Sequence, residues 1–337
     1  MTQTEAGLKI PVTIVTGFLG AGKTTLLQRL VRESSGRRIA VIQNEVSEEM
    51  GIESAVLTSS DGAIIPDFFE LPNGCICCSS KDDLIVTLEN IVRLGRERID
   101  YIIVETTGIA DPCSVAEIFW LDNELCSFFT LDGIVAVVDC LNFESTILDD
   151  CNGKTGLGHS EIAKRQIAIA DRILINKTDL SVAPDLERIV GFVRSLNPVA
   201  EIQTTKNSNV AVDWVLDIDS FDHSRLSYSL NHVPASVDHV YITFANSRFD
   251  RHHLDLVIGE MLWEADVGKI FRAKGLFKAA SDDQWYGLQA VGALFETLPQ
   301  PTAGLLPQNT GDAKFLFIGS QLDKEAISHK ISDAIHI

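Results

Sequence analysis

Residues 17–24 read GFLGAGKT, a glycine-rich stretch that ends in a lysine and a hydroxyl residue. Glycines let a backbone wrap around phosphate groups with its N–H groups pointing inward, and the N-terminus of a following helix adds partial positive charge. Lys23 would reach the β- and γ-phosphates of a nucleotide, and the Thr24 hydroxyl would bind Mg²⁺. The spacing therefore predicts a phosphate-binding loop made of Gly17, Phe18, Leu19, Gly20, Ala21, Gly22, Lys23, Thr24 and Thr25.

The segments on either side of this loop support that prediction. An apolar, β-branched run over 10–16 is typical of a buried parallel strand, and an amphipathic run over 25–33 is typical of a helix. The order strand, GxxxxGK[ST], helix is the context that a phosphate-binding loop requires. A glycine-rich turn without a ligand is the alternative, but such a turn needs no Lys23 followed by Thr24.

A second polar segment indicates which nucleotide is bound. A predicted strand over 172–175 delivers the tetrad NKTD, in which Asn176, Lys177 and Asp179 are the candidate ligands. The Asp179 carboxylate would accept from guanine N1–H and the exocyclic amine, Asn176 would meet the other edge, and Lys177 would lie along the base. Adenine has no N1–H, so the carboxylate would stay unpaired against it. A polar loop is the alternative for NKTD alone, but its position after the phosphate loop predicts GTP and GDP.

A third segment, ETTG, follows the apolar strand predicted at 101–104. A carboxylate at this place in such folds meets Mg²⁺ directly or through water, and a glycine one turn later can sense the γ-phosphate. These roles fall to Glu105 and Gly108; an ordinary strand-to-loop junction is the alternative. The catalytic candidates are thus Lys23, Thr24 and Glu105. No glutamine directly follows ETTG to orient a water molecule, so the sequence assigns no catalytic base.

Three thiols lie within four residues, at Cys75, Cys77 and Cys78. Successive side chains alternate in direction, so all three cannot be small core residues. Clustered thiolates are typical ligands of Zn²⁺. A tetrahedral zinc ion would need a fourth ligand, for which Glu45 is a candidate; Glu45 could equally contact Mg²⁺ or be a solvated carboxylate. A redox-active CxxC pair and inert buried thiols are the alternatives. The cysteines lie between the phosphate loop and ETTG, which predicts coupling of metal binding to nucleotide state.

Composition restricts the class of protein. A net charge of −19 argues against nucleic acid and against an anionic membrane surface as partners. The longest apolar runs fall short of a membrane span, and the first residues lack the apolar region of a signal peptide. Seven cysteines, three of them clustered, fit a reducing compartment with one thiol site. We therefore expect a cytoplasmic enzyme; its oligomeric state is not predictable.

Strand and helix patterns alternate through the first two thirds of the chain and predict a P-loop NTPase α/β fold with a doubly wound, mainly parallel sheet. We expect this GTPase domain over 1–217. A polar, serine-containing segment over 218–236 breaks the pattern and is interpreted as a linker. Over 237–337 the order changes to a strand, a helix, two or three strands (268–277, 284–295 and 314–318) and a final helix, which predicts a smaller α+β domain.

With these motifs, the chain resembles the CobW-like GTPases, metallochaperone relatives of the urease- and hydrogenase-maturation GTPases. The resemblance covers nearly the whole chain and includes GFLGAGKTTLL, ELPNGCICC, ETTGIADP, QIAIADRILINKTDL and the late RAKG. Within that family the chain looks most like the eukaryotic zinc-regulated GTPase metalloprotein activators, on the segments CCSSKDD, ADPCSVAEIFWLDNEL and MLWEADV.

The resemblance implies zinc held at the three clustered cysteines and delivered on GTP hydrolysis to a client metalloprotein, typically a methionine aminopeptidase. Eukaryotic members usually carry an N-terminal client-docking stretch with a Cys-Pro-Glu-Leu-like core. Here the nine residues before the first predicted strand contain neither Cys nor Pro, so the client is left open. The resemblance also implies that a segment after the metal site approaches the nucleotide, namely Cys78, Ser79, Ser80, Lys81 and Asp82.

Overall fold

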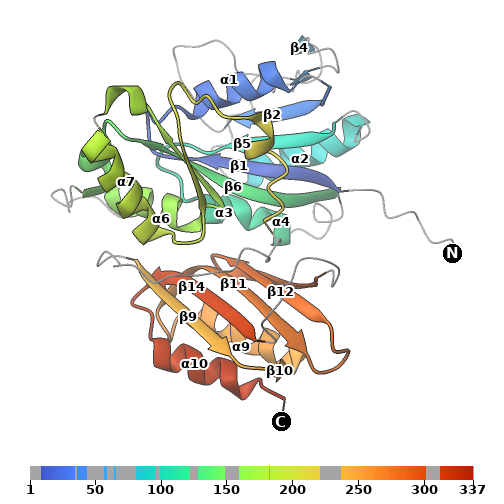
Figure 1. Ribbon diagram of the computed structural model, residues 1–337. Coiled ribbons are helices and arrows are strands. Elements are labelled where there is room, and N and C mark those ends of the chain that lie inside the picture. The colour runs from blue at the N-terminus through green and yellow to red at the C-terminus, as the bar shows by residue number, and fades with distance from the viewer. Residues whose placement is uncertain are drawn as a thin grey trace. The chain divides into compact units, whose positions relative to one another are not determined.

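Two β-sheets organise the chain, and each forms the centre of one compact unit (Figure 1). The computed structural model describes residues 9–34, 36–43, 57–58, 64–65, 81–95, 99–121, 128–148, 159–181, 183–220, 237–300 and 312–336.

The first sheet contains eight strands in the described residues, in the order β4-β3-β2-β5-β1-β6-β7-β8. Its centre is parallel: β1 pairs with β5 and β6, β2 with β5, and β6 with β7. At one edge β3 and β4 continue it in antiparallel fashion. The bounds are β1 Ile10–Thr16, β2 Ile39–Gln43, β3 Leu57–Thr58, β4 Ile64–Ile65, β5 Tyr101–Glu105, β6 Phe129–Asp139, β7 Arg172–Asn176 and β8 Glu201–Thr204.

Helices connect these strands, as parallel pairing requires. In the described residues they are α1 Lys23–Glu33, α2 Lys81–Gly95, α3 Pro112–Ala116, α4 Ile118–Leu121, α6 His159–Ile169, α7 Ala183–Leu196 and α8 Val212–Val215, with a π turn at Glu144–Leu148 and a 3-10 turn at Thr178–Leu180. The apolar stripe of α1 (Leu26, Leu27 and Leu30) packs on side chains of the central strands, among them Val15 and Ile103. This packing fixes the start of α1 beside the carboxyl end of β1.

The order of the strands decides where the polar segments meet. The parallel strands β5, β1, β6 and β7 are neighbours, so their carboxyl ends lie at one edge of the sheet. The phosphate loop follows β1, ETTG begins at the end of β5, and NKTD begins at the end of β7. Ligands of open α/β sheets bind at this edge. The fold therefore brings three segments that are far apart in the sequence to one place.

The second unit is a largely antiparallel sheet in the order β13-β12-β11-β14-β9, with the short β10 pairing in parallel with β11. The bounds are β9 Asp238–Phe244, β10 Arg248–Phe249, β11 Lys269–Ala279, β12 Trp285–Val291, β13 Leu294–Pro299 and β14 Ala313–Ser320. Helices α9, Arg251–Glu264, and α10, Lys324–Asp333, lie on the same face of this sheet (Figure 1). Their apolar residues pack on an aromatic cluster that includes Phe249, Phe277 and Phe315.

Helices α9 and α10 each begin directly after an aspartate, which stabilises otherwise unpaired N–H groups of the first turn. The Asp250 carboxylate accepts a hydrogen bond from the His253 backbone N–H at 3.0 Å, and the Asp323 carboxylate accepts from two backbone N–H groups of α10. The two histidines of α9, His252 and His253, are exposed, which is typical of a solvated helix start.

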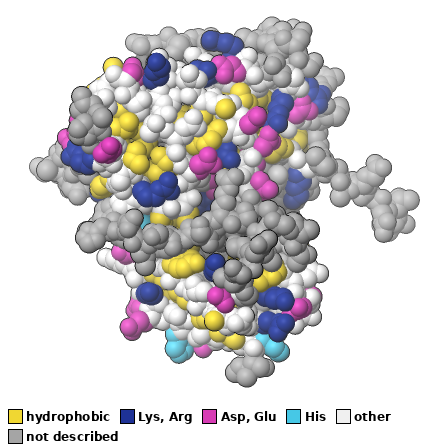
Figure 2. All heavy atoms as spheres, viewed as in Figure 1, with side chains coloured by type: hydrophobic (Ala, Val, Ile, Leu, Met, Phe, Trp, Pro, Cys, Tyr) yellow, Lys and Arg dark blue, Asp and Glu magenta, His cyan; other side chains and the backbone are white. Residues whose placement is uncertain are grey.

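The predicted fold class is confirmed: a parallel P-loop sheet with helices is followed by a smaller unit on an antiparallel sheet. The main difference lies at 284–295, which the sequence predicts as a single strand. The structure has a hairpin there, with β12 and β13 joined at Gly292, whose φ is +60°. None of the helices in the described residues is both long and apolar enough to cross a membrane. On the face shown in Figure 2, the described acidic and basic side chains are interspersed.

Candidate nucleotide site

Glycine is required at two positions of the loop after β1. Gly17 has φ +139°, and a Cβ there would lie 2.2 Å from the Val137 carbonyl oxygen of the neighbouring strand β6. Gly22 has φ +106°, and a Cβ there would lie 2.3 Å from the Asn176 side-chain nitrogen. Both distances are far below van der Waals contact, so no other residue fits without displacing its neighbours. The loop is thus packed closely against the ends of β6 and β7.

The two polar residues at the start of α1 face different groups. The Lys23 side chain is only 4% exposed, and its Nζ donates to the Phe18 carbonyl oxygen within the loop at 3.4 Å. The Thr24 hydroxyl donates to Glu105 Oε1 at 3.2 Å, and Glu105 itself is buried. A threonine hydroxyl and a carboxylate are oxygen ligands of the kind that Mg²⁺ takes. The pair therefore suits Mg²⁺ chemically.

The ETTG segment lies directly against the phosphate loop. The Thr106 hydroxyl donates to the Thr16 hydroxyl at 3.0 Å at the end of β1. A Cβ on Gly108 would lie 2.5 Å from the Leu19 backbone nitrogen, so the two backbones approach as closely as a glycine allows. A change in the conformation of one segment would therefore displace backbone atoms of the other.

The first residue of NKTD connects this segment to the phosphate loop. Asn176 is buried; its side-chain nitrogen donates to the Ala21 carbonyl oxygen at 3.0 Å, and its side-chain oxygen accepts from the Ser208 backbone N–H at 2.9 Å. The Ser208 hydroxyl in turn donates to the Gly22 carbonyl oxygen at 3.0 Å. Asn176 thus holds two loops in place, while its predicted contact with the base stays a prediction.

Lys177 adopts a left-handed backbone conformation, φ +64°, and its Nζ pairs with Asp139 Oδ2 at 2.7 Å. Burial raises the pKa of the Asp139 carboxyl, but hydrogen bonds from Lys177 and Asn142 outweigh it, and the net pKa lies below its ordinary value. This ion pair orients the lysine at the end of β7. Asp179 is exposed in the 3-10 turn, where its carboxylate is accessible to a base.

The loop after β8 also belongs to this site, although no sequence motif predicts it. The Thr205 carbonyl oxygen accepts from both the backbone N–H and the hydroxyl of Thr178, at 3.1 and 2.9 Å. Ser208, three residues later, contacts both Asn176 and the phosphate loop. The polar run TTKNS after a predicted strand was the available signal, but it matches no motif specific enough to be singled out.

Part of the predicted site lies outside the described residues: Glu45, Cys75, Cys77, Cys78, Ser79 and Ser80. The backbone of Lys81 and Asp82 forms the first turn of α2. Two cysteines outside the predicted cluster, Cys113 and Cys140, are buried, and burial raises the pKa of both thiols. They are unsuited to act as exposed thiolates.

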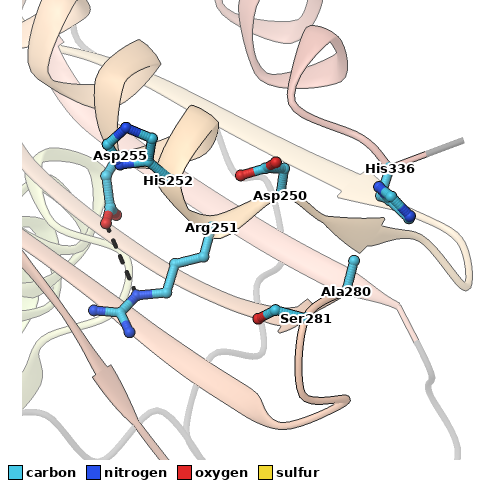
Figure 3. Close-up of a pocket in the computed structure, with 7 residues that line it drawn as sticks. All are labelled: Asp250, Arg251, His252, Asp255, Ala280, Ser281 and His336. Carbon is cyan, nitrogen blue, oxygen red and sulfur yellow. Dashed lines mark ion pairs between the residues drawn. The ribbon is translucent and has the colours of Figure 1, made fainter.

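A pocket of about 580 Å³ lies at the first turn of α9 in the second unit (Figure 3). Arg251 crosses it, with its guanidinium 4.7 Å from the centre of the Tyr286 ring and its Nε 3.8 Å from Asp255 Oδ2. The remaining lining residues are Asp250, His252, Ala280, Ser281 and His336. None of the predicted nucleotide or metal ligands is among them.

The fold and the site define a P-loop nucleotide-binding protein. Residues 11–204 match the family described as CobW/HypB/UreG, nucleotide-binding domain, and residues 240–335 match the cobalamin synthesis protein cobW C-terminal domain. Among curated proteins, zinc-regulated GTPase metalloprotein activator 1 of Schizosaccharomyces pombe is 32% identical over 333 residues, which are 86% of this chain and 77% of the relative.

The relative of the same name in Saccharomyces cerevisiae is 31% identical over 363 residues, covering 97% of this chain and 83% of its own. The crystal structure of the Zn(II)-bound YjiA GTPase from Escherichia coli superposes with a TM-score of 0.71 at 27% identity and covers 97% of this chain and 99% of its own. That protein is called zinc chaperone YjiA. The chain described here therefore belongs to the CobW/HypB/UreG family, and it is a GTPase.

Proposed function

We propose that this GTPase is a zinc metallochaperone that binds Zn²⁺ at Cys75, Cys77 and Cys78 and transfers it to a client metalloenzyme when GTP is hydrolysed. The main support is the contact between Gly108 and Leu19, since it joins the two phosphate-facing segments. The cysteines lie on the chain between these segments. Relatives named for zinc, in yeasts and in a bacterium, support the choice of metal.

In this proposal the phosphate-loop amides and Lys23 stabilise negative charge on the β- and γ-phosphates. Thr24 and Glu105 would hold Mg²⁺, and the ion would supply positive charge against the negative charge of the phosphates. Asp179, with Asn176 and Lys177, selects guanine. We assign no residue as the catalytic base that activates water. Intrinsic hydrolysis is therefore expected to be slow and to depend on the bound metal or on the client protein.

Zinc is cargo here and not a resident cofactor. Three thiolates leave one tetrahedral position for an exchangeable ligand, and Glu45 is a candidate for it. We propose that loss of the γ-phosphate moves ETTG and thereby weakens zinc binding, which would release the metal to a client in the cytoplasm. The client proposed is a methionine aminopeptidase.

A metal-transfer assay tests this function. We expect the zinc-loaded protein to restore the activity of a metal-free methionine aminopeptidase in the presence of GTP and Mg²⁺, and to do so poorly with GDP or a non-hydrolysable GTP analogue. The matched control is the double variant Cys77→Ser, Cys78→Ser, incubated with the same total zinc. A chelator that buffers free zinc at one concentration separates transfer from simple release. Equal recovery with every nucleotide, or with the cysteine variant, would contradict the proposal.

A further inference from the structure

Two consecutive side chains of α6 hold the segment that follows Glu105. Gln166 is 1% exposed, and its side-chain nitrogen donates to the Gly108 carbonyl oxygen at 3.2 Å and to the Ala110 carbonyl oxygen at 3.1 Å. Its neighbour Arg165 pairs through Nη1 with Asp111 Oδ2 at 3.1 Å. The turn over 108–111 is therefore bound to a helix that lies more than fifty residues later in the chain.

The other side of this turn lies against the phosphate loop. Gly108 leaves no room for a side chain beside the Leu19 backbone nitrogen. The turn is closed internally by the Ala110 N–H, which donates to the Thr107 carbonyl oxygen at 3.1 Å. The turn thus contacts the loop that would hold the γ-phosphate and is also hydrogen-bonded to Gln166.

A buried carbonyl group needs a hydrogen-bond donor, and Gln166 supplies both of its side-chain N–H groups to this one turn. Without them the buried Gly108 carbonyl group and the partly buried Ala110 carbonyl group must lose this hydrogen bond or turn towards another donor. Either outcome would rotate the peptide planes of 108–110 and move the backbone that faces Leu19. The conformation of the turn therefore depends on the Gln166 amide.

Helix α6 is followed in the chain by the strand that ends at the predicted guanine-binding segment. α6 ends at Ile169, β7 begins at Arg172, and β7 delivers Asn176. Gln166 thus lies ten residues before the residue that bonds to the phosphate loop at Ala21. The end of α6 and the strand β7 thus connect the anchor of the turn to the segment that would recognise guanine.

We propose that Gln166 is a positioning residue for GTP hydrolysis, which holds the Gly108–Ala110 turn in the conformation that accepts the γ-phosphate. It acts through the turn and contacts no nucleotide itself. Arg165 has a secondary role, because it fixes Asp111 at the end of the same turn. The proposal rests on the GTPase activity and not on zinc transfer, so the metal-transfer assay does not decide it.

The test compares the nucleotide states in the variant Gln166→Met, which keeps the length of the side chain and its helix propensity but removes both donors. We expect about ten- to hundredfold weaker binding of a non-hydrolysable GTP analogue and a similar loss of kcat, because the buried Gly108 carbonyl group and the partly buried Ala110 carbonyl group lose their donor. GDP lacks the γ-phosphate, so its Kd should stay within about twofold of the wild-type value.

Asn197→Ala is the matched control. The Asn197 side-chain nitrogen donates to the carbonyl groups of Ile167, Ala168 and Ala170 at the end of the same helix, at 2.9, 3.0 and 2.8 Å. This variant should lower Tm while leaving the ratio of GTP-analogue to GDP affinity unchanged. An equal change of that ratio in both variants would show that any weakening of α6 is sufficient and would overturn the specific role of Gln166.

A second variant keeps the proposal testable if Gln166→Met does not fold. Arg165→Met removes the ion pair to Asp111, whose side chain is 34% exposed, and spares the Gln166 amide. We expect the GTP-analogue Kd to rise about two- to fivefold with GDP binding unchanged, a smaller effect because the lost pair is partly solvated. Wild-type affinity and kcat in whichever of the two variants folds would contradict the proposal.

Discussion

We expect Lys23→Ala to abolish measurable GTP hydrolysis and to weaken GTP binding by about 30- to 5,000-fold. The reason is the position of the ammonium group: the side chain is almost fully buried at the start of α1, and its Nζ lies within the phosphate loop next to the Phe18 carbonyl oxygen. Removing one partner of a buried charge pair costs about 2–5 kcal/mol, which gives that range of affinity.

Titration calorimetry with a non-hydrolysable GTP analogue and a phosphate-release assay measure the two effects. Lys9→Ala is the matched control, because Lys9 is exposed just before β1 and at the opposite end of that strand from the loop. It should leave both quantities within about twofold. Near-normal turnover in Lys23→Ala would show that the loop after β1 does not bind the phosphates.

The second large effect concerns the choice of base. Asp179→Asn replaces a carboxylate, which would accept two hydrogen bonds from guanine, by an amide with one acceptor oxygen and one donor NH₂ group. We expect GTP binding to weaken by about a hundredfold or more and xanthosine triphosphate to bind better than GTP, because xanthine carries an oxygen where guanine carries its amine. The exposed position of Asp179 indicates that its substitution leaves the fold intact.

Competition between the two nucleotides for a fluorescent analogue gives the ratio of affinities. Asp185→Asn is the control, since Asp185 is an exposed aspartate in the first turn of the next helix, α7. It removes the same charge close by without touching NKTD. An unchanged preference for GTP in Asp179→Asn would show that Asp179 does not recognise guanine.

The three polar segments could be predicted from the sequence because each carries its own local signal. GFLGAGKT, ETTG and NKTD each follow an apolar strand, and parallel strands place such segments at one edge of a sheet. The order of the strands, with β5, β1, β6 and β7 adjacent, needed the structure, because crossover connections leave strand order open.

The residues that hold the segments together could not be predicted. Gln166 and Ser208 lie 58 and 186 residues from their partners Gly108 and Gly22, and a buried Gln or Ser carries no sequence pattern that names its partner. The hairpin of β12 and β13 was missed for a different reason. Apolar residues continue through its turn at Gly292, so hydrophobicity alone suggested one long strand.

The central claim is that zinc binding and nucleotide state are coupled, and the zinc affinity of each nucleotide state tests it most directly. Competition against a chromogenic chelator, in Mg²⁺ with either GDP or a non-hydrolysable GTP analogue, gives both values. We predict about 5- to 150-fold tighter zinc binding in the GTP state, and zinc must tighten GTP over GDP by the same factor. Cys77→Ser with Cys78→Ser should remove the difference and leave GDP binding intact. Equal zinc affinity in both states would contradict the coupling and leave the metal a structural part of a GTP-regulated scaffold.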